Sequence, residues 1–101
     1  MAPEPLAYFR GKILPADQAQ VPVMTHALHY GTAVFEGIRG NWNEEEGKIF
    51  IFRPLEHFQR FLDGCRILRM TLPHTAEELV QITKDLVQTG GFKEDLYIRP
   101  L

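Results

Sequence analysis

The sequence predicts an α+β domain in which two helices pack on one face of a mainly antiparallel sheet. Short strand-like segments fill the first half of the chain, two helical periodicities follow one another in the second half, and a last strand-like segment closes it. Strands and helices therefore do not alternate as they would in a parallel α/β fold. The chain has 101 residues, 45% of them hydrophobic, so we expect one small globular domain spanning residues 1–101.

A hairpin is expected at the start of the chain. Leu6–Phe9 is typical of a strand, Arg10–Lys12 of a turn, and Ile13–Leu14 of the returning arm. Pro15–Asp17 then interrupts the pattern. Gln20–Met24 alternates only weakly and contains a proline, which favours an edge strand or no strand.

A short helical turn and a second hairpin are expected next. His26–Gly31 indicates the helical turn, and Ala33–Arg39 reads as a strand. Gly40–Gly47 is polar and holds three consecutive glutamates, so we interpret it as a solvated hairpin loop. Lys48–Arg53 predicts the partner strand.

Two helices and a strand complete the chain. The first helix begins at Pro54, which suits a first helical position, and should fray near Ile67–Met70. The second begins at a capping box formed by Thr75 and Glu78. Asp95–Leu101 reads as the last strand. The apolar stripes of the helices are Leu55, Phe58, Leu62 and Cys65 in the first, and Leu79, Ile82 and Leu86 in the second, which Gly90 and Gly91 end.

Composition excludes several classes of function. The net charge is −2 without a basic block, which argues against a nucleic-acid surface. No apolar run is long enough to cross a bilayer, and Met1–Pro5 does not resemble a signal peptide. Cys65 is alone, which argues against a disulfide and favours a cytoplasmic location. His26 and His29 could place two ligands on one face of a turn, but no carboxylate or cysteine accompanies them at metal-ligand spacing, so we expect no metal site.

The segment Thr25–Arg39 carries the clearest functional signal. It contains Tyr30, Phe35 and Arg39 together with glycines that allow close approach of a ligand. These are the components of a small-molecule pocket wall. A turn followed by a buried strand would use the same residue types, so both interpretations stand on composition alone.

Four segments together resemble a known family. They are His26–Arg39, Tyr8-Phe-x-Gly-Lys12, Phe52-Arg-x-x-Glu-His-x-x-Arg60 and Tyr97-Ile-Arg-Pro-Leu101. In this order they resemble the branched-chain aminotransferases, which are fold-type IV enzymes that use pyridoxal phosphate. The resemblance covers essentially the whole chain but only the small N-terminal domain of such an enzyme.

The resemblance implies amino transfer between branched-chain L-amino acids and 2-oxoglutarate or glutamate, in a homodimer. In the family a lysine of the larger C-terminal domain holds the cofactor as a Schiff base, and we expect that domain to be absent from these 101 residues. None of the chain's own lysines has the context of a desolvated catalytic amine. We therefore expect no catalytic residue in this chain and no transamination by it alone. The four lysines are Lys12, Lys48, Lys84 and Lys93.

The resemblance also implies roles for single residues. Arg60 would hold the cofactor phosphate, although an exposed helix arginine is the ordinary alternative. Phe35 and Gly37 would shape the apolar part of the substrate pocket, or would simply pack in a core. Tyr30 would line the pocket of the neighbouring subunit.

Two further residues would bind the substrate directly. Tyr97 would bind its α-carboxylate through the hydroxyl. Arg99, two residues on and so on the same strand face, would meet the second carboxylate of glutamate, or would form a structural ion pair instead. Arg39 is interpreted as a pocket-edge or structural residue.

Two alternatives stay open at this point. A D-amino-acid aminotransferase or an aminodeoxychorismate lyase would share the fold, although Phe-Glu-Gly-Ile-Arg39 together with Tyr97–Leu101 favours the branched-chain type. A non-catalytic fragment or interaction module would have kept the fold without the chemistry. Such a module would have no need for Tyr30, Arg60, Tyr97 and Arg99 together.

Overall fold

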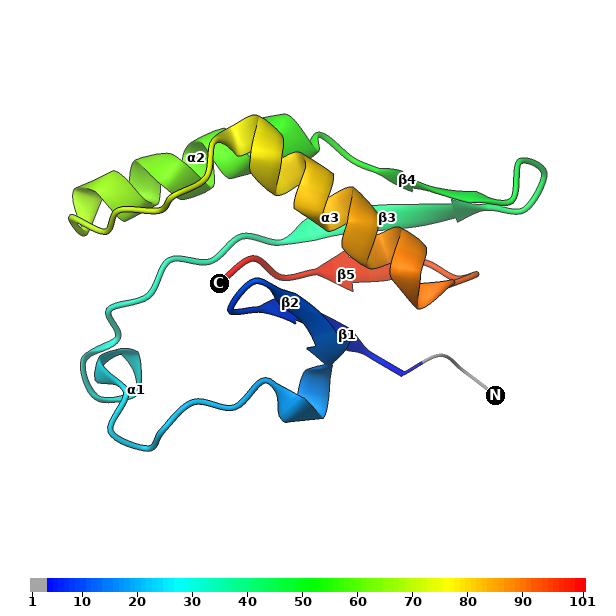
Figure 1. Ribbon diagram of the computed structural model, residues 1–101. Helices are drawn as coiled ribbons and strands as arrows, with labels where there is room; N and C mark the ends of the chain where they lie inside the picture. Colours follow the sequence, from blue (N-terminus) through cyan, green and yellow to red (C-terminus); the bar gives the residue numbers. More distant parts are fainter. Residues whose placement is uncertain (1–3) are drawn as a thin grey trace.

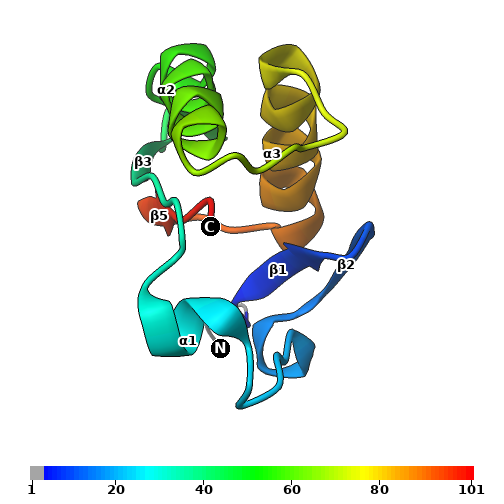
Figure 2. The ribbon, with the colours of Figure 1, turned by 90° about the vertical axis from the view of Figure 1, so that its left-hand side faces the viewer.

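A computed structural model describes residues 4–101, so the first three residues of Met1–Pro5 lie outside the described part. The fold class is α+β, as predicted. Helices α2 (Pro54–Ile67) and α3 (Ala76–Gly90) lie next to each other over one face of the larger sheet (Figures 1 and 2). None of the helices in residues 4–101 combines the length and the apolar character that a membrane span requires.

The strands divide into two antiparallel sheets. β1 (Leu6–Phe9) and β2 (Lys12–Pro15) form a hairpin of their own, as predicted. The larger sheet has the order β4-β3-β5, built from β3 (Ile38–Asn43), β4 (Lys48–Ile51) and β5 (Leu96–Ile98). Because β5 pairs with β3, the last part of the chain lies beside its middle, and this pairing positions the pocket described below.

Two short helical elements follow the first hairpin. A 3-10 turn spans Ala16–Gln18, and Gln20–Met24 forms no strand. α1 (His26–Tyr30) confirms the expected helical turn and ends at Gly31, whose φ of 65° is a left-handed value that glycine adopts without strain. In Figure 1, α1 lies at the far end of the molecule from the β3–β4 turn.

The core lies between the two long helices and the larger sheet. Its most buried residue is Ile38, which no solvent reaches, and it packs with aromatic and small side chains of the helices. Phe58 and Phe61 meet edge to face with ring centroids 6.3 Å apart. The helical stripe expected from sequence included Phe58 and Cys65 but missed Phe61. The buried apolar residues of the core are Ile38, Phe58, Phe61, Cys65 and Ala76.

Both helix starts agree with the sequence prediction. Pro54 is the first residue of α2, where its missing N–H costs no helical hydrogen bond. At α3 the capping box is complete: the Glu78 amide donates to Thr75 Oγ1 at 3.1 Å, and the Thr75 amide donates to Glu78 Oε1 at 3.0 Å. α2 ends at Ile67, where fraying was expected.

The strand boundaries differ from the prediction in four places. The strand expected at Ala33–Arg39 begins only at Ile38, and residues 31–37 carry no regular secondary structure. β3 then continues to Asn43, so the expected loop Gly40–Gly47 shrinks to its last four residues. Close pairing explains this extension, since a Cβ at Gly40 would come within 2.9 Å of Ile49 Cγ2, a space only glycine leaves free.

The other two strands are shorter than expected. β4 ends at Ile51 because Arg53 takes a left-handed conformation, with φ of 48°, to begin the next helix. β5 ends at Ile98, two residues before Pro100, which has no amide hydrogen for a ladder.

Candidate functional site

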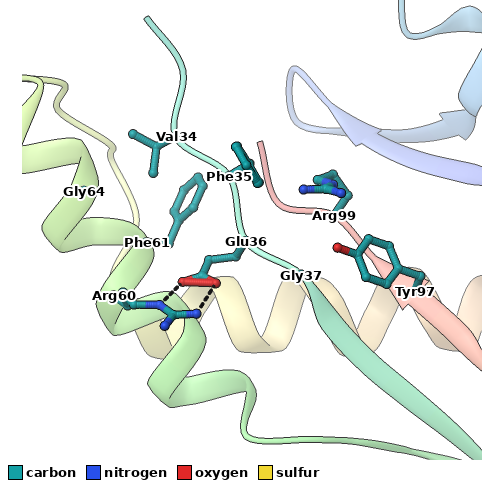
Figure 3. Close-up of a pocket in the computed structure, with 9 residues that line it drawn as sticks. All are labelled: Val34, Phe35, Glu36, Gly37, Arg60, Phe61, Gly64, Tyr97 and Arg99. Atoms are coloured by element: carbon teal, nitrogen blue, oxygen red, sulfur yellow. Dashed lines mark hydrogen bonds and ion pairs between the residues drawn. The ribbon is translucent and has the colours of Figure 1, made fainter. Parts of the chain in front are cut away.

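The candidate site is built around the stretch Val34–Gly37, which leads into β3. Successive side chains of this stretch point to opposite sides, as in an extended chain. Val34 packs against Gly64 of α2, where an added Cβ would come within 2.9 Å of Val34 Cγ1. Glu36 also points toward α2, whereas Phe35 points toward Arg99 (Figure 3). The stretch therefore forms a partition with α2 on one side and the end of β5 on the other.

Glu36 is a buried carboxylate, with 6% of its surface exposed. Both of its oxygens accept from the guanidinium of Arg60: Nε donates to Oε1, and Nη2 donates to Oε2 at 2.8 Å. A planar guanidinium meets a carboxylate through two parallel hydrogen bonds, which fixes orientation as well as distance. The pair ties the partition to the middle of α2.

His57, one turn before Arg60, provides a further contact. Its Nδ1 lies 3.2 Å from Glu36 Oε2, so this nitrogen donates to the carboxylate. The hydrogen bonds from Arg60 lower the pKa of Glu36 from 4.5 to about 2; burial opposes this shift, and His57 adds to it. Glu36 is therefore a buried anion at neutral pH.

Arg99 lies against aromatic rings on the other side of the partition. Its guanidinium carbon lies 4.8 Å from the centroid of the Phe35 ring and 5.1 Å from that of the Tyr97 ring. Such cation–π contacts hold the guanidinium while leaving its N–H groups free for an anion. The apolar rings of Phe35 and Tyr97 and the positive charge of Arg99 therefore lie side by side.

Gly37 and Tyr97 approach each other closely across the same region. A Cβ on residue 37 would overlap the Tyr97 hydroxyl and come within 2.9 Å of the ring carbon Cζ. The absence of a side chain at Gly37 thus makes room for the phenol in its observed position (Figure 3).

These residues line one open pocket of about 410 Å³. It contains two guanidinium groups and one carboxylate, and that carboxylate is already paired, so the pocket favours anions. The phenol of Tyr97 adds a hydrogen-bond donor. The lining residues are Val34, Phe35, Glu36, Gly37, Arg60, Phe61, Gly64, Tyr97 and Arg99.

Five of the seven residues expected at a site therefore lie around one pocket: Phe35, Gly37, Arg60, Tyr97 and Arg99. The other two lie outside its lining. Tyr30 is 72% exposed on α1, where its ring lies 4.4 Å from that of His26. Arg39 is exposed on β3, paired across the ladder with Tyr97.

Glu36 and His57 are the polar residues of the site that sequence reasoning missed. A glutamate between Phe35 and Gly37, in an apolar stretch, was itself a signal, because a charge in such surroundings needs a cationic partner. The partner could not be identified locally, since 24 residues separate Glu36 from Arg60.

The four lysines lie apart from the pocket. Lys12, Lys48, Lys84 and Lys93 are all exposed, and none belongs to the lining. Within residues 4–101 no three His, Cys, Asp or Glu side chains gather as metal ligands would.

Sequence comparison finds enzymes that are similar to the chain, whereas no protein-family model matches it. The probable branched-chain-amino-acid aminotransferase of Aquifex aeolicus is 50% identical over 95 residues, which are 94% of this chain and 30% of that protein. The branched-chain-amino-acid aminotransferase of Escherichia coli K12 is 39% identical over 94 residues, 93% of this chain and 29% of that protein. The chain thus spans about 30% of the length of these relatives.

The solved structures that resemble this fold are also branched-chain aminotransferases. The branched-chain aminotransferase of the archaeon Thermoproteus uzoniensis, with norvaline, has a TM-score of 0.82 and 43% identity, over 88% of this chain and 29% of that one. The branched-chain aminotransferase of Thermobaculum terrenum, in its pyridoxal-phosphate form, has a TM-score of 0.77 and 39% identity, over 87% and 29%. By sequence and by fold, therefore, this chain is similar to a part of the branched-chain aminotransferases that makes up about 30% of their length, and the resemblance predicted from its motifs is confirmed.

Proposed function

We propose that the protein catalyses pyridoxal-phosphate-dependent transfer of the amino group between branched-chain L-amino acids and 2-oxoglutarate. In this proposal the chain supplies the wall of the substrate pocket and the arginine that binds the cofactor phosphate. The observation that carries it is the gathering of Phe35, Gly37, Arg60, Tyr97 and Arg99 around one pocket. Relatives solved in a pyridoxal-phosphate form and with pyridoxamine 5'-phosphate support the choice of cofactor.

The residues present fit a phosphate-bearing cofactor. The Arg60 side chain is 74% exposed, and Glu36 occupies only its Nε and one N–H of Nη2. The remaining N–H groups, both of Nη1 and the second of Nη2, are unused by that pair and suit phosphate oxygens. When bound, the cofactor supplies the electron sink that lets the substrate lose its α-proton.

The substrate is oriented by Tyr97 of β5, by Arg99 just after that strand, and by Phe35 of the partition. Tyr97 donates its hydroxyl to the α-carboxylate. Phe35 offers an apolar surface to a leucine, isoleucine or valine side chain. Arg99, which rests on that same ring, meets the second carboxylate when glutamate or 2-oxoglutarate occupies the pocket. One location thereby accepts both apolar and acidic side chains.

The amine that moves the proton comes from outside this chain. All four lysines of the chain are exposed and lie apart from the pocket, whereas a Schiff-base lysine must reach the pocket and be partly desolvated there.

A second copy of the chain completes the site in this proposal. Tyr30 is exposed, and so are Val23, Met24 and Leu28 in the same part of the sequence, so this segment offers apolar side chains to another protomer. In a homodimer, Tyr30 reaches the pocket of the other copy. Light scattering measures the oligomeric state, and a monomer at micromolar concentration contradicts this part of the proposal.

Substrate profiling tests the proposed reaction. We expect the protein, as its gene encodes it, to transfer the amino group of leucine, isoleucine and valine to 2-oxoglutarate and to leave D-alanine unused. Preference for D-alanine would instead indicate the D-amino-acid enzymes that share the fold. Lyase activity on aminodeoxychorismate would indicate the second related class, and no turnover with any amino donor would favour the non-catalytic module.

A matched pair of arginines on α2 tests the role of Arg60. Arg60→Gln should weaken binding of pyridoxal phosphate about tenfold or more, because a charge-assisted contact is lost. Arg66→Gln should leave it unchanged, since Arg66 pairs with Asp63 on the helix surface and does not line the pocket. Equal affinities for the two variants would contradict the assignment.

A further inference from the structure

We propose that Glu36 is a positioning residue, which holds one edge of the Arg60 guanidinium and so directs the other edge at a phosphate in the pocket. The inference deepens the proposed function and rests on its assignment of Arg60 as the phosphate-binding arginine. In this role Glu36 acts through Arg60 and not through a contact of its own with cofactor or substrate.

The geometry of the pair divides the guanidinium into two edges. Glu36 takes the edge made of Nε and one Nη2 hydrogen, through two hydrogen bonds in one plane. The opposite edge, made of Nη1 and the second Nη2 hydrogen, keeps three donors. Because the guanidinium is flat and rigid, fixing one edge fixes the direction of the other.

Glu36 is itself held firmly enough to serve as a reference point. It is 6% exposed, its backbone amide donates to the Pro100 carbonyl at 3.1 Å, and His57 Nδ1 contacts its carboxylate. The stretch that carries it packs against α2 through Val34 and Gly64. The carboxylate therefore has little freedom to follow a moving arginine.

Arg60 by itself has no such restraint. Its side chain is 74% exposed and its long stem can take many rotamers in water. Without Glu36, ordering that stem would be required each time a phosphate binds. With Glu36, the ordering is already complete in the folded protein, which favours binding.

The charge of Glu36 acts in the opposite direction, because a carboxylate near a phosphate repels it. Two substitutions separate the effects. Glu36→Asp keeps the negative charge but shortens the side chain by one methylene group. It therefore disturbs the positioning of Arg60 without removing the charge. Glu36→Gln removes the charge and one of the two matched hydrogen bonds. Positioning predicts weaker phosphate binding in both variants, whereas a purely electrostatic role predicts tighter binding in Glu36→Gln.

The test compares two ligands that differ only in the phosphate. Pyridoxamine 5'-phosphate and pyridoxamine lack the aldehyde that condenses with lysine, so their dissociation constants report non-covalent contacts. Calorimetry is carried out on the cofactor-free protein as its gene encodes it. Asp63→Asn is the matched control, since it removes the carboxylate of another arginine pair on α2, away from the pocket.

We expect Glu36→Asp and Glu36→Gln each to weaken binding of pyridoxamine 5'-phosphate by about threefold to tenfold, the cost of ordering one long side chain at binding. Binding of pyridoxamine should be unchanged, as should that of both ligands to the Asp63→Asn variant. In an Arg60→Gln background the Glu36 substitutions should have no further effect.

Three results would overturn the inference. One is unchanged or tighter binding of pyridoxamine 5'-phosphate to Glu36→Gln. Another is an equal loss for both ligands, which would mean that Glu36 only supports the fold. The third is a Glu36 effect that persists without Arg60. If Arg60→Gln alone leaves phosphate binding unchanged, the proposed function of Arg60 fails first, and that failure is recognisable by itself.

Discussion

At the scale of single residues, the contact between Gly37 and Tyr97 gives the sharpest prediction. Gly37→Ala places a methyl group where the Tyr97 hydroxyl lies, so the phenol must move. Tyr97 is 64% exposed and can turn into water, so the free energy of unfolding should change by less than about 1 kcal/mol. The proposed carboxylate contact would be lost, and kcat/KM for leucine should fall about tenfold or more.

A double substitution shows whether Gly37 acts through Tyr97. Tyr97→Phe removes the hydroxyl, so in that background Gly37→Ala should cost much less than it does alone. Additive losses in kcat/KM would mean that the glycine serves the pocket in another way.

The lowered pKa of Glu36 predicts a stability effect with a defined sign. A carboxyl group whose folded pKa lies below 4.5 stabilises the protein above that pH and loses its contribution as pH falls toward about 2. At pH 7, Glu36→Gln should lower the free energy of unfolding by about 1–2 kcal/mol, at the lower end for a charged hydrogen bond because Arg60 is exposed. Urea unfolding at pH 7, 4 and 3 should show the difference from the unsubstituted protein shrinking. A constant difference would contradict the linkage.

At the scale of elements, the bounds of the helices were predicted from the sequence more accurately than the bounds of the strands. Pro54 and the Thr75–Glu78 box act through neighbours within one turn, so local pattern was enough. Residues 33–37 alternate like a strand, yet strand formation depends on a partner far along the chain. Lys48–Ile51 instead pairs with Gly40–Asn43, whose polar sequence had indicated a loop.

The candidate site shows the same division between local and distant information. Phe35, Gly37, Arg60, Tyr97 and Arg99 were identified because the motifs around them resemble those of a known family. The pairing of Glu36 with Arg60 depends on how the partition packs against α2. That packing cannot be predicted from any short segment of the sequence.

The capping box of α3 provides a test of local structure. Thr75→Ala removes the acceptor for the Glu78 amide and should cost about 1 kcal/mol of unfolding free energy, measured by urea denaturation. Thr89→Ala, near the other end of the helix, is the control. Its hydroxyl only bonds back to the Asp85 carbonyl at an exposed position, so a change below about 0.5 kcal/mol is expected. Similar losses at both positions would argue against a special role of the cap.

At the scale of the whole molecule, the exposure of the lysines predicts a chemical result. The 101-residue chain, of 11.6 kDa, should keep an unchanged mass after incubation with equimolar pyridoxal phosphate and borohydride reduction, because none of its four lysines lines the pocket that would hold the cofactor. Intact-mass spectrometry checks this. A stoichiometric adduct on a single lysine would mean that one of the four is activated. The proposal that the catalytic amine comes from outside these 101 residues would then be wrong.

The pairing of β5 with β3 also sets the order in which the pocket can form. The ribosome adds every residue of the two long helices and of the two hairpins before it adds Tyr97 and Arg99. Until then the partition has α2 on one side and nothing opposite. A nascent chain of this sequence therefore carries the Arg60 side of its pocket well before the Tyr97 side, and any affinity for a ligand that touches both sides is acquired only after translation has passed Arg99.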